Sequence, residues 1–148
     1  MVNYMMNKKS EANLEIAVTC LEKDDENFYS VGASRAYYAI FQAAKYLLEK
    51  NSFDYKLFKR NEPKAIKQRD YAHGSIRMAL AYFLLNNGFN NKDDLIFIKK
   101  MRSTFNELYN LRLEGDYEKT VISKKSLKKA IKRAEKFIDE LKKYSSEG

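Results

Sequence analysis

Arg112 stands where the helical pattern of the chain calls for an apolar side chain. The hydrophobic positions before it recur at spacings of three and four residues, namely Leu95, Ile98, Met101, Phe105 and Leu108. The same progression next reaches Arg112, so we expect its guanidinium to be partly buried, paired or lining a cleft, because a buried charge without a partner is costly. Asp116 and Tyr117 come just after Gly115, a natural helix terminator. This short stretch is the first candidate for chemistry.

The side chains of this stretch favour anion recognition. The planar guanidinium of Arg112 can hold a phosphate group. The Tyr117 hydroxyl, with an ordinary pKa of about 10, can donate a proton but is a poor base at neutral pH. Asp116 can act as a base only if its pKa is raised, and a neighbouring arginine shifts it the other way. Arg112, Asp116 and Tyr117 are therefore the catalytic candidates, with none of them assigned. The structural alternative is an Arg112–Asp116 ion pair that orients Tyr117.

Other catalytic patterns are weak in this sequence. The only histidine, His73, lies four residues after Arg69, and the favoured interpretation is a surface or helix-start histidine. The glycines form no phosphate-binding loop, and no serine has a histidine at a recognisable spacing. A single cysteine, Cys20, excludes an internal disulfide and a four-cysteine zinc site. We expect neither a metal nor a cofactor.

The stretch from Ser34 to Leu48 is the element that must organise the fold. It is apolar almost all the way round, and such a helix is a buried one. Alanines keep its surface low, so that neighbouring helices can approach closely. Ser30 is a plausible N-cap, and the helix should run to about residue 50 or 51. Its polar first turn contributes Ser34, Arg35 and Tyr38 as one possible wall of a site.

Four further helices are predicted around this central one. Their expected spans are about 8–24, about 74–85, from 93 or 94 towards 112, and from about 123 to 144. The chain should be flexible at about 1–7 and 145–148. Residues 51–64 read as a long loop, NSFDYKLFKRNEPK, whose basic and aromatic side chains could serve single-stranded nucleic acid. The favoured alternative is a loop fixed to the body by Phe53, Leu57 and Phe58. The fold class is thus all-α: an antiparallel four-helix bundle with an additional helix, five helices in a single domain over 1–148.

The last helix has a strongly basic face. Its exposed side should carry Lys128, Lys129, Lys132, Arg133 and Lys136. The whole chain has a formal net charge of +8, which favours anionic partners, with nucleic acid the leading candidate. The alternative to a binding surface is a lysine-rich helix face that is simply exposed to solvent. No signal peptide and no membrane-spanning run is recognisable, so we expect a cytoplasmic protein without a membrane partner.

Three stretches together resemble the HEPN family (higher eukaryotes and prokaryotes nucleotide-binding domain), in particular its small stand-alone bacterial and archaeal members. They are SRAYYAIFQAAKYLLEKN, AHGSIRMALAYFL, and LRLEGDY with the following SLKKAIKRAEKFIDEL. The resemblance covers about residues 14–141. It implies a HEPN-like helical bundle, commonly a homodimer, that acts in toxin–antitoxin, phage-defence or CRISPR-associated systems. A small nucleotidyltransferase is the partner protein that the family suggests.

The resemblance also bears on activity. Several members are metal-independent endoribonucleases that carry an arginine followed a few residues later by a histidine, with two copies meeting at the dimer interface. Arg112 matches the arginine, but Tyr117 occupies the place of the histidine, and no histidine follows anywhere. RNA cleavage needs a group that takes the 2′-hydroxyl proton, and tyrosine is poorly suited to that role. The resemblance therefore implies a dimeric nucleotide- or RNA-binding protein with a degenerate ribonuclease motif.

Two alternatives stay open. One is an active ribonuclease toxin in which Tyr117, Asp116 or His73 replaces the missing histidine. The other is a scaffold protein whose basic last helix binds an acidic partner. In the favoured hypothesis, nucleotide or RNA occupies a cleft lined by Arg112 and Tyr117 together with Ser34, Arg35 and Tyr38 of the central helix.

Overall fold

The computed structural model describes residues 2–62, 64, 72–117 and 121–145, and for residues 2–7, 116, 117 and 145 it describes the backbone only. Within these residues the chain is all-helical, which confirms the predicted class. The helices are α1 (Val2–Glu22), α2 (Glu26–Lys50), α3 (Tyr55–Asn61), α4 (His73–Asn86), α5 (Lys92–Tyr117) and α6 (Lys124–Ser145). None of these helices is long and apolar enough to cross a bilayer.

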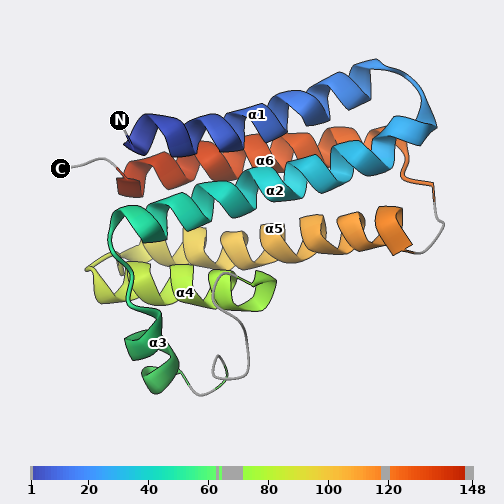
Figure 1. Ribbon diagram of the computed structural model, residues 1–148. Coiled ribbons are helices and arrows are strands. Elements are labelled where there is room, and N and C mark those ends of the chain that lie inside the picture. The colour runs from blue at the N-terminus through green and yellow to red at the C-terminus, as the bar shows by residue number, and fades with distance from the viewer. Residues whose placement is uncertain (1, 63, 65–71, 118–120, 146–148) are drawn as a thin grey trace.

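Helix α2 is the centre of the molecule, as its sequence predicts. It packs against α1, α4, α5 and α6, and Figure 1 shows α1, α2, α5 and α6 running alongside one another, with α4 beside one half of α5. The alanines at 36, 39 and 44 are fully buried in these contacts. Because alanine adds little bulk, the neighbouring helices can pack closely against this surface.

One glycine lets three helices meet. Gly32 of α2 lies where a Cβ atom would come within 2.9 Å of both Leu127 methyl groups of α6 and 3.1 Å from Cys20 Cβ of α1. Both Leu127 and Cys20 are buried. At the junction of α1, α2 and α6, any side chain at this position would therefore force Leu127 to move.

The predicted loop at 51–64 contains a helix, so the expected count of five helices is wrong. Asp54 caps α3 by accepting a hydrogen bond from the Leu57 amide at 3.1 Å. The rings of Tyr55 and Phe58 are buried, and Phe58 packs edge-on against Tyr82 of α4. These rings are thus unavailable for stacking on nucleic-acid bases, and the alternative of a segment fixed to the body is confirmed. Leu57 takes no part in this, since it is exposed.

Helix α1 begins at Val2, earlier than the predicted start at about residue 8. Two other helix ends differ from the prediction for identifiable reasons. Helix α2 begins at Glu26 because Asp25, rather than Ser30, is its N-cap, with a carboxylate that accepts from the Asn27 amide at 2.9 Å. Helix α5 continues through Gly115 to Tyr117. Gly115 is a close-approach residue instead of a terminator: a Cβ atom there would lie 3.0 Å from Ser30 Cβ and 3.2 Å from Ser30 Cα.

Candidate functional site

Arg112 lies against two aromatic rings of the central helix. The side chain is half-buried, as the interrupted apolar stripe predicts. Its guanidinium carbon is 5.1 Å from the ring centroid of Tyr38 and 5.8 Å from that of Tyr37. Both distances fit cation–π contact, which holds a guanidinium in place without neutralising its charge. The two tyrosine rings therefore fix the position of the Arg112 charge at the contact between α2 and α5.

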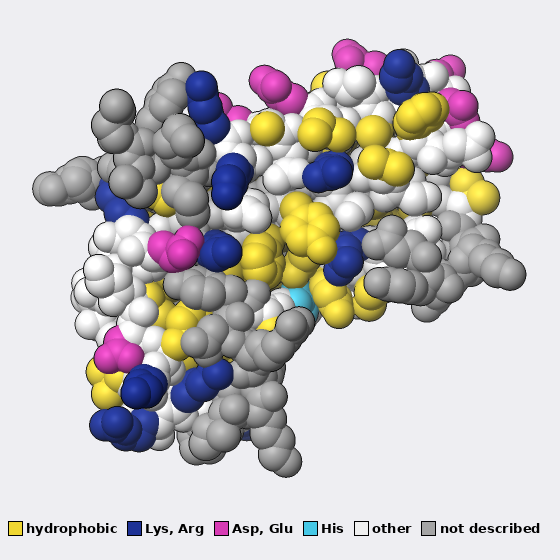
Figure 2. Space-filling view, in the orientation of Figure 1, with side chains coloured by type: hydrophobic (Ala, Val, Ile, Leu, Met, Phe, Trp, Pro, Cys, Tyr) yellow, Lys and Arg dark blue, Asp and Glu magenta, His cyan; other side chains and the backbone are white. Residues whose placement is uncertain are grey.

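His73, the first residue of α4, joins the same cluster. Its Nδ1 atom is 3.0 Å from the Tyr37 hydroxyl, and its ring stacks on Tyr109 of α5 with centroids 3.9 Å apart and planes 14° apart. The helix-start interpretation is confirmed, and the side chain is half-buried rather than fully exposed. Figure 2 shows the histidine in a hollow of this face, next to hydrophobic side chains.

The surroundings of His73 keep the imidazole neutral. Burial lowers its pKa to about 4, and the positive charge of Arg77 pushes in the same direction. A hydrogen bond with the Asn106 side chain opposes this shift, and Arg112 adds a further lowering effect. Asn106 is itself held by Arg77, whose Nη1 donates to its Oδ1 at 2.8 Å. At neutral pH, His73 is therefore an uncharged positioning group.

Tyr37 stays protonated at neutral pH, whereas His73 stays unprotonated. It is buried, and this burial raises the pKa of its hydroxyl well above the ordinary value. The hydroxyl and the imidazole thus form a neutral pair at physiological pH, with the donor set by the histidine tautomer. At neutral pH, His73 cannot take up a proton and Tyr37 cannot release one without a large cost. The arrangement can bind and orient an anion, but neither of these two groups is a base that titrates near neutrality.

The residues predicted for the cleft wall are only partly brought together. Tyr38 lies under the Arg112 guanidinium. Ser34 is half-buried, and the contacts Gly115–Ser30 and Tyr109–Tyr37 place it along the same α2–α5 seam. Arg35 points elsewhere, because its Nη1 donates to Asn13 Oδ1 of α1 at 3.2 Å.

The predictions for Asp116 and Tyr117 concern side chains that lie outside the described part of the structure. Their backbone continues α5. The proposed Arg112–Asp116 ion pair and the role of Tyr117 therefore remain predictions.

Sequence reasoning missed four members of the cluster. They are Tyr37, Arg77, Asn106 and Tyr109. A signal for two of them was present: Asn106, Tyr109 and Arg112 follow one another at intervals of three, which forms a polar stripe beside the apolar one. No sequence pattern indicated that Arg77 of α4 would join the cluster, since its position depends on how that helix packs.

The basic side chains of α6 point in two directions. Lys128, Lys129, Lys132 and Lys136 are exposed. Arg133 instead turns towards α5, where its Nη1 forms an ion pair with Glu107 Oε2 at 2.9 Å. Across the described residues, no group of three or more His, Cys, Asp or Glu side chains could hold a metal ion.

Comparison with known proteins adds no assignment. No protein-family model matches the chain, and no curated protein matches it either.

The His73 environment predicts an unusual acid titration. We expect the single histidine signal in a proton NMR titration to move with a midpoint near 4, because the folded state favours the neutral ring. Unfolded chains protonate histidine at about 6.5, so the unfolded state binds more protons between about pH 4 and 6.5. The free energy of unfolding should therefore fall as the pH drops through this window. His73→Gln should flatten that fall in urea titrations, and an NMR midpoint near 6.5 would contradict the assignment.

Proposed function

We propose that this chain is a HEPN-type protein that binds nucleotide or RNA through Arg112 and retains a degenerate ribonuclease motif. In this proposal α1, α2, α5 and α6 form the antiparallel four-helix bundle of the family, and α4 with the short α3 is the addition. The three stretches that resemble the family fall on α2, on α4, and on the end of α5 with α6. This distribution supports the proposal, because the resemblance then covers helices that pack together.

The observation that carries the proposal is the placement of Arg112. A guanidinium held half-buried over two tyrosine rings is positioned without a full counter-charge from those rings. Its fork can hold two oxygens of one phosphate. The half-exposed ring of Tyr38 offers a surface on which a nucleobase can stack. Together these features suit a nucleotide unit better than a simple inorganic anion.

The biological setting follows from the same resemblance. We expect a cytoplasmic homodimer that serves a toxin–antitoxin or defence system, with a small nucleotidyltransferase as its partner protein. Sedimentation equilibrium at micromolar concentration should give twice the 17.4 kDa mass of one chain. A monomer under those conditions would rule the dimer out.

A second candidate is an active metal-independent endoribonuclease. The observation in its favour is that His73 lies close enough to Arg112 for their charges to interact. His73 could then replace the histidine that is absent after Arg112. Against this, the ring is stacked on Tyr109 and bonded to Tyr37 and Asn106, and its pKa lies far below neutrality. The third candidate, a scaffold with a basic α6, requires no role for Arg112 at all.

The proposal is tested by replacing Arg112. We expect Arg112→Ala to weaken binding of a fluorescent single-stranded RNA or of a nucleotide at least tenfold, equivalent to about 1.4 kcal/mol. Arg102→Ala is the matched control, since Arg102 is an exposed arginine of the same helix. It should change the dissociation constant less than twofold. Equal losses in both variants would indicate binding by net charge alone, and circular dichroism should show that both variants remain folded.

The same proteins separate the ribonuclease candidate. Labelled RNA incubated with the wild type in EDTA should stay intact under the binding proposal. Cleavage that disappears in Arg112→Ala and in His73→Gln would favour the ribonuclease instead.

A further inference from the structure

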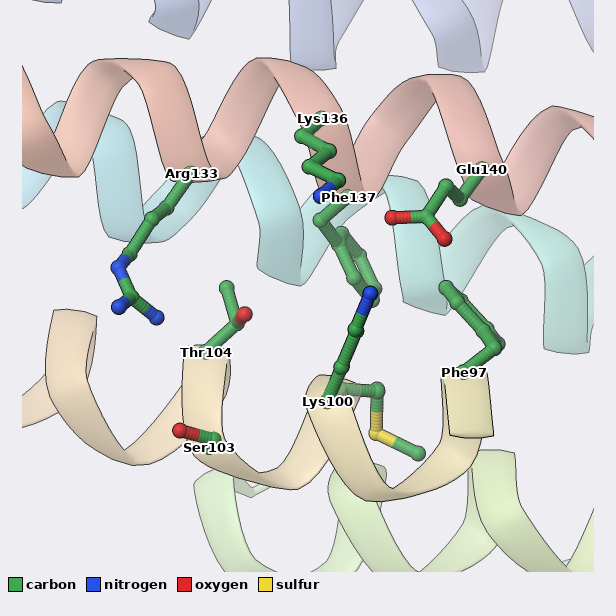
Figure 3. A pocket seen from close by; sticks show the side chains of 9 residues that line it. Phe97, Lys100, Ser103, Thr104, Arg133, Lys136, Phe137 and Glu140 are labelled. Atoms are coloured by element: carbon green, nitrogen blue, oxygen red, sulfur yellow. The ribbon is translucent and has the colours of Figure 1, made fainter. Parts of the chain in front are cut away.

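A cavity of about 400 Å³ opens between α5 and α6, away from the Arg112 cluster. In Figure 1, α2 lies in front of α6, whereas in Figure 3 α5 and α6 lie in front of α2. The two figures therefore show opposite sides of the molecule, and the cavity opens on the side that is hidden in Figure 1. Its volume falls in the range of small-molecule sites. None of its lining residues contacts Arg112 or His73 in the cluster described above.

The cavity gathers positive charge from both helices. Lys100 of α5 and Arg133 and Lys136 of α6 line it, against a single carboxylate, Glu140. Figure 3 shows the Lys100 and Lys136 side chains extending into the space between the helices. Among the described residues, neither of these two lysines has a carboxylate within ion-pair distance, whereas Arg133 is paired with Glu107. Both lysines are exposed, and an anion in the cavity would gain a favourable interaction with each of their charges.

The remaining lining residues indicate what kind of anion fits. Ser103 and Thr104 also line the cavity, and the Thr104 side chain extends into the space between the helices, where its hydroxyl can donate to a phosphate oxygen (Figure 3). The nearly parallel rings of Phe97 and Phe137, 5.9 Å apart, form an aromatic floor. Glu140 provides an acceptor that suits a hydroxyl or amino group of a ligand and disfavours a second phosphate at that end.

The pockets on both sides of the cavity have mixed charge. Beyond Lys100 the neighbouring pocket is lined by Asp93 and Lys143, and beyond Arg133 the next one is lined by Glu107 and Lys129. A nucleic-acid strand running through all three pockets would place phosphates beside Asp93 and Glu107, whereas a small ligand in the central cavity would not. The charge pattern therefore favours a ligand that fits inside the central cavity.

We propose that the α5–α6 cavity binds the phosphate groups of a nucleotide-sized small molecule, with Lys100, Lys136 and Arg133 as its cationic contacts. This site is separate from Arg112 and does not depend on the function proposed above. It also differs from a general lysine face, because Lys128 and Lys132 of α6 do not line the cavity.

Titration calorimetry with ATP and with inorganic pyrophosphate tests the site. In the Arg112→Ala background, which removes the other nucleotide site proposed above, the double variant Lys100→Gln/Lys136→Gln should bind both probes at least tenfold more weakly than its parent. Lys99→Gln/Lys128→Gln is the matched control: it removes the same charge from exposed lysines of the same two helices, and should stay within twofold. Glu140→Gln should strengthen pyrophosphate binding, because the only carboxylate of the cavity is then neutral. A gain of affinity cannot arise from damaged folding.

Three outcomes would overturn the proposal. The first is no binding of either probe to the wild type at millimolar concentration. The second is an equal loss in the cavity variant and in its matched control. The third is a single-stranded RNA that binds more tightly than ATP and loses affinity in the cavity variant, since the site would then serve a strand. The Arg112 site proposed above would also take ATP, so these titrations use the Arg112→Ala background. ATP binding that persists in this background and is lost with Lys100→Gln/Lys136→Gln belongs to the cavity, so a failure of this site is distinguishable from a failure of the Arg112 proposal.

Discussion

Replacing Phe105 with alanine is expected to lower the free energy of unfolding by about 3–5 kcal/mol, the usual cost of removing a buried phenyl ring. Phe105 is 0% exposed. Its ring meets Tyr37 edge-on at 6.5 Å and Phe137 edge-on at 5.4 Å, and lies 6.1 Å from the ring of His73. One side chain of α5 thus connects α2, α4 and α6, and its loss leaves a cavity where several rings cannot all move inward.

Urea unfolding followed by circular dichroism measures this effect. For a chain of this size, the loss corresponds to a drop of roughly 10 °C in the melting temperature. Leu95→Ala is the control on the same helix: Leu95 is 49% exposed, and its truncation should cost less than about 0.5 kcal/mol. A similar loss in both variants would mean that Phe105 is not the centre of the core.

Replacing Gly32 with valine is expected to destabilise the protein by about 1–3 kcal/mol through overpacking. The first carbon of any side chain there would already lie 2.8 Å from a Leu127 methyl group, and valine adds two further methyl groups. Alanine at the same position should be far milder. Its higher helix propensity, worth about 1 kcal/mol over glycine, offsets much of the contact with the movable end of Leu127.

A double-mutant cycle identifies the origin of this effect. Leu127→Ala removes the methyl groups that the new side chain meets, so Gly32→Val should cost clearly less in that background than in the wild type. If the two substitutions are additive, the contact with Leu127 is not the cause. Chemical denaturation of the four proteins in the cycle provides the measurement.

The sequence carries the parts of this fold that depend on regular patterns. The buried α2 and the amphipathic α6 are readable from the spacing of their apolar residues. The span of α6 matches the prediction, whereas α2 begins before the predicted cap at Ser30. The helix at residues 55–61 was not predicted because α3 is too short to show a helical period, and its Phe58 ring is buried against Tyr82 of α4. Gly115 was misread since a glycine for close approach and a glycine for termination look alike in one sequence.

The candidate site was predictable only along single helices. Arg112 was recognisable because it interrupts an apolar stripe, and its half-buried position follows from that interruption. The meeting of His73 with Tyr37 and Tyr109 could not be foreseen, since it joins three helices distant in sequence. The lowered pKa of His73 has the same origin: it results from burial and from the charge of Arg77, both of which exist only after α4 has packed.

Gly115 is a further position at which a mutation would disrupt the Arg112 site. This residue has no side chain to offer a ligand, yet the closeness of α5 to Ser30 of α2 depends on its lacking one. A larger residue there would push the two helices apart one turn from the place where Arg112 meets Tyr38. Random substitutions can therefore damage the site at more positions than the residues whose side chains contact Arg112.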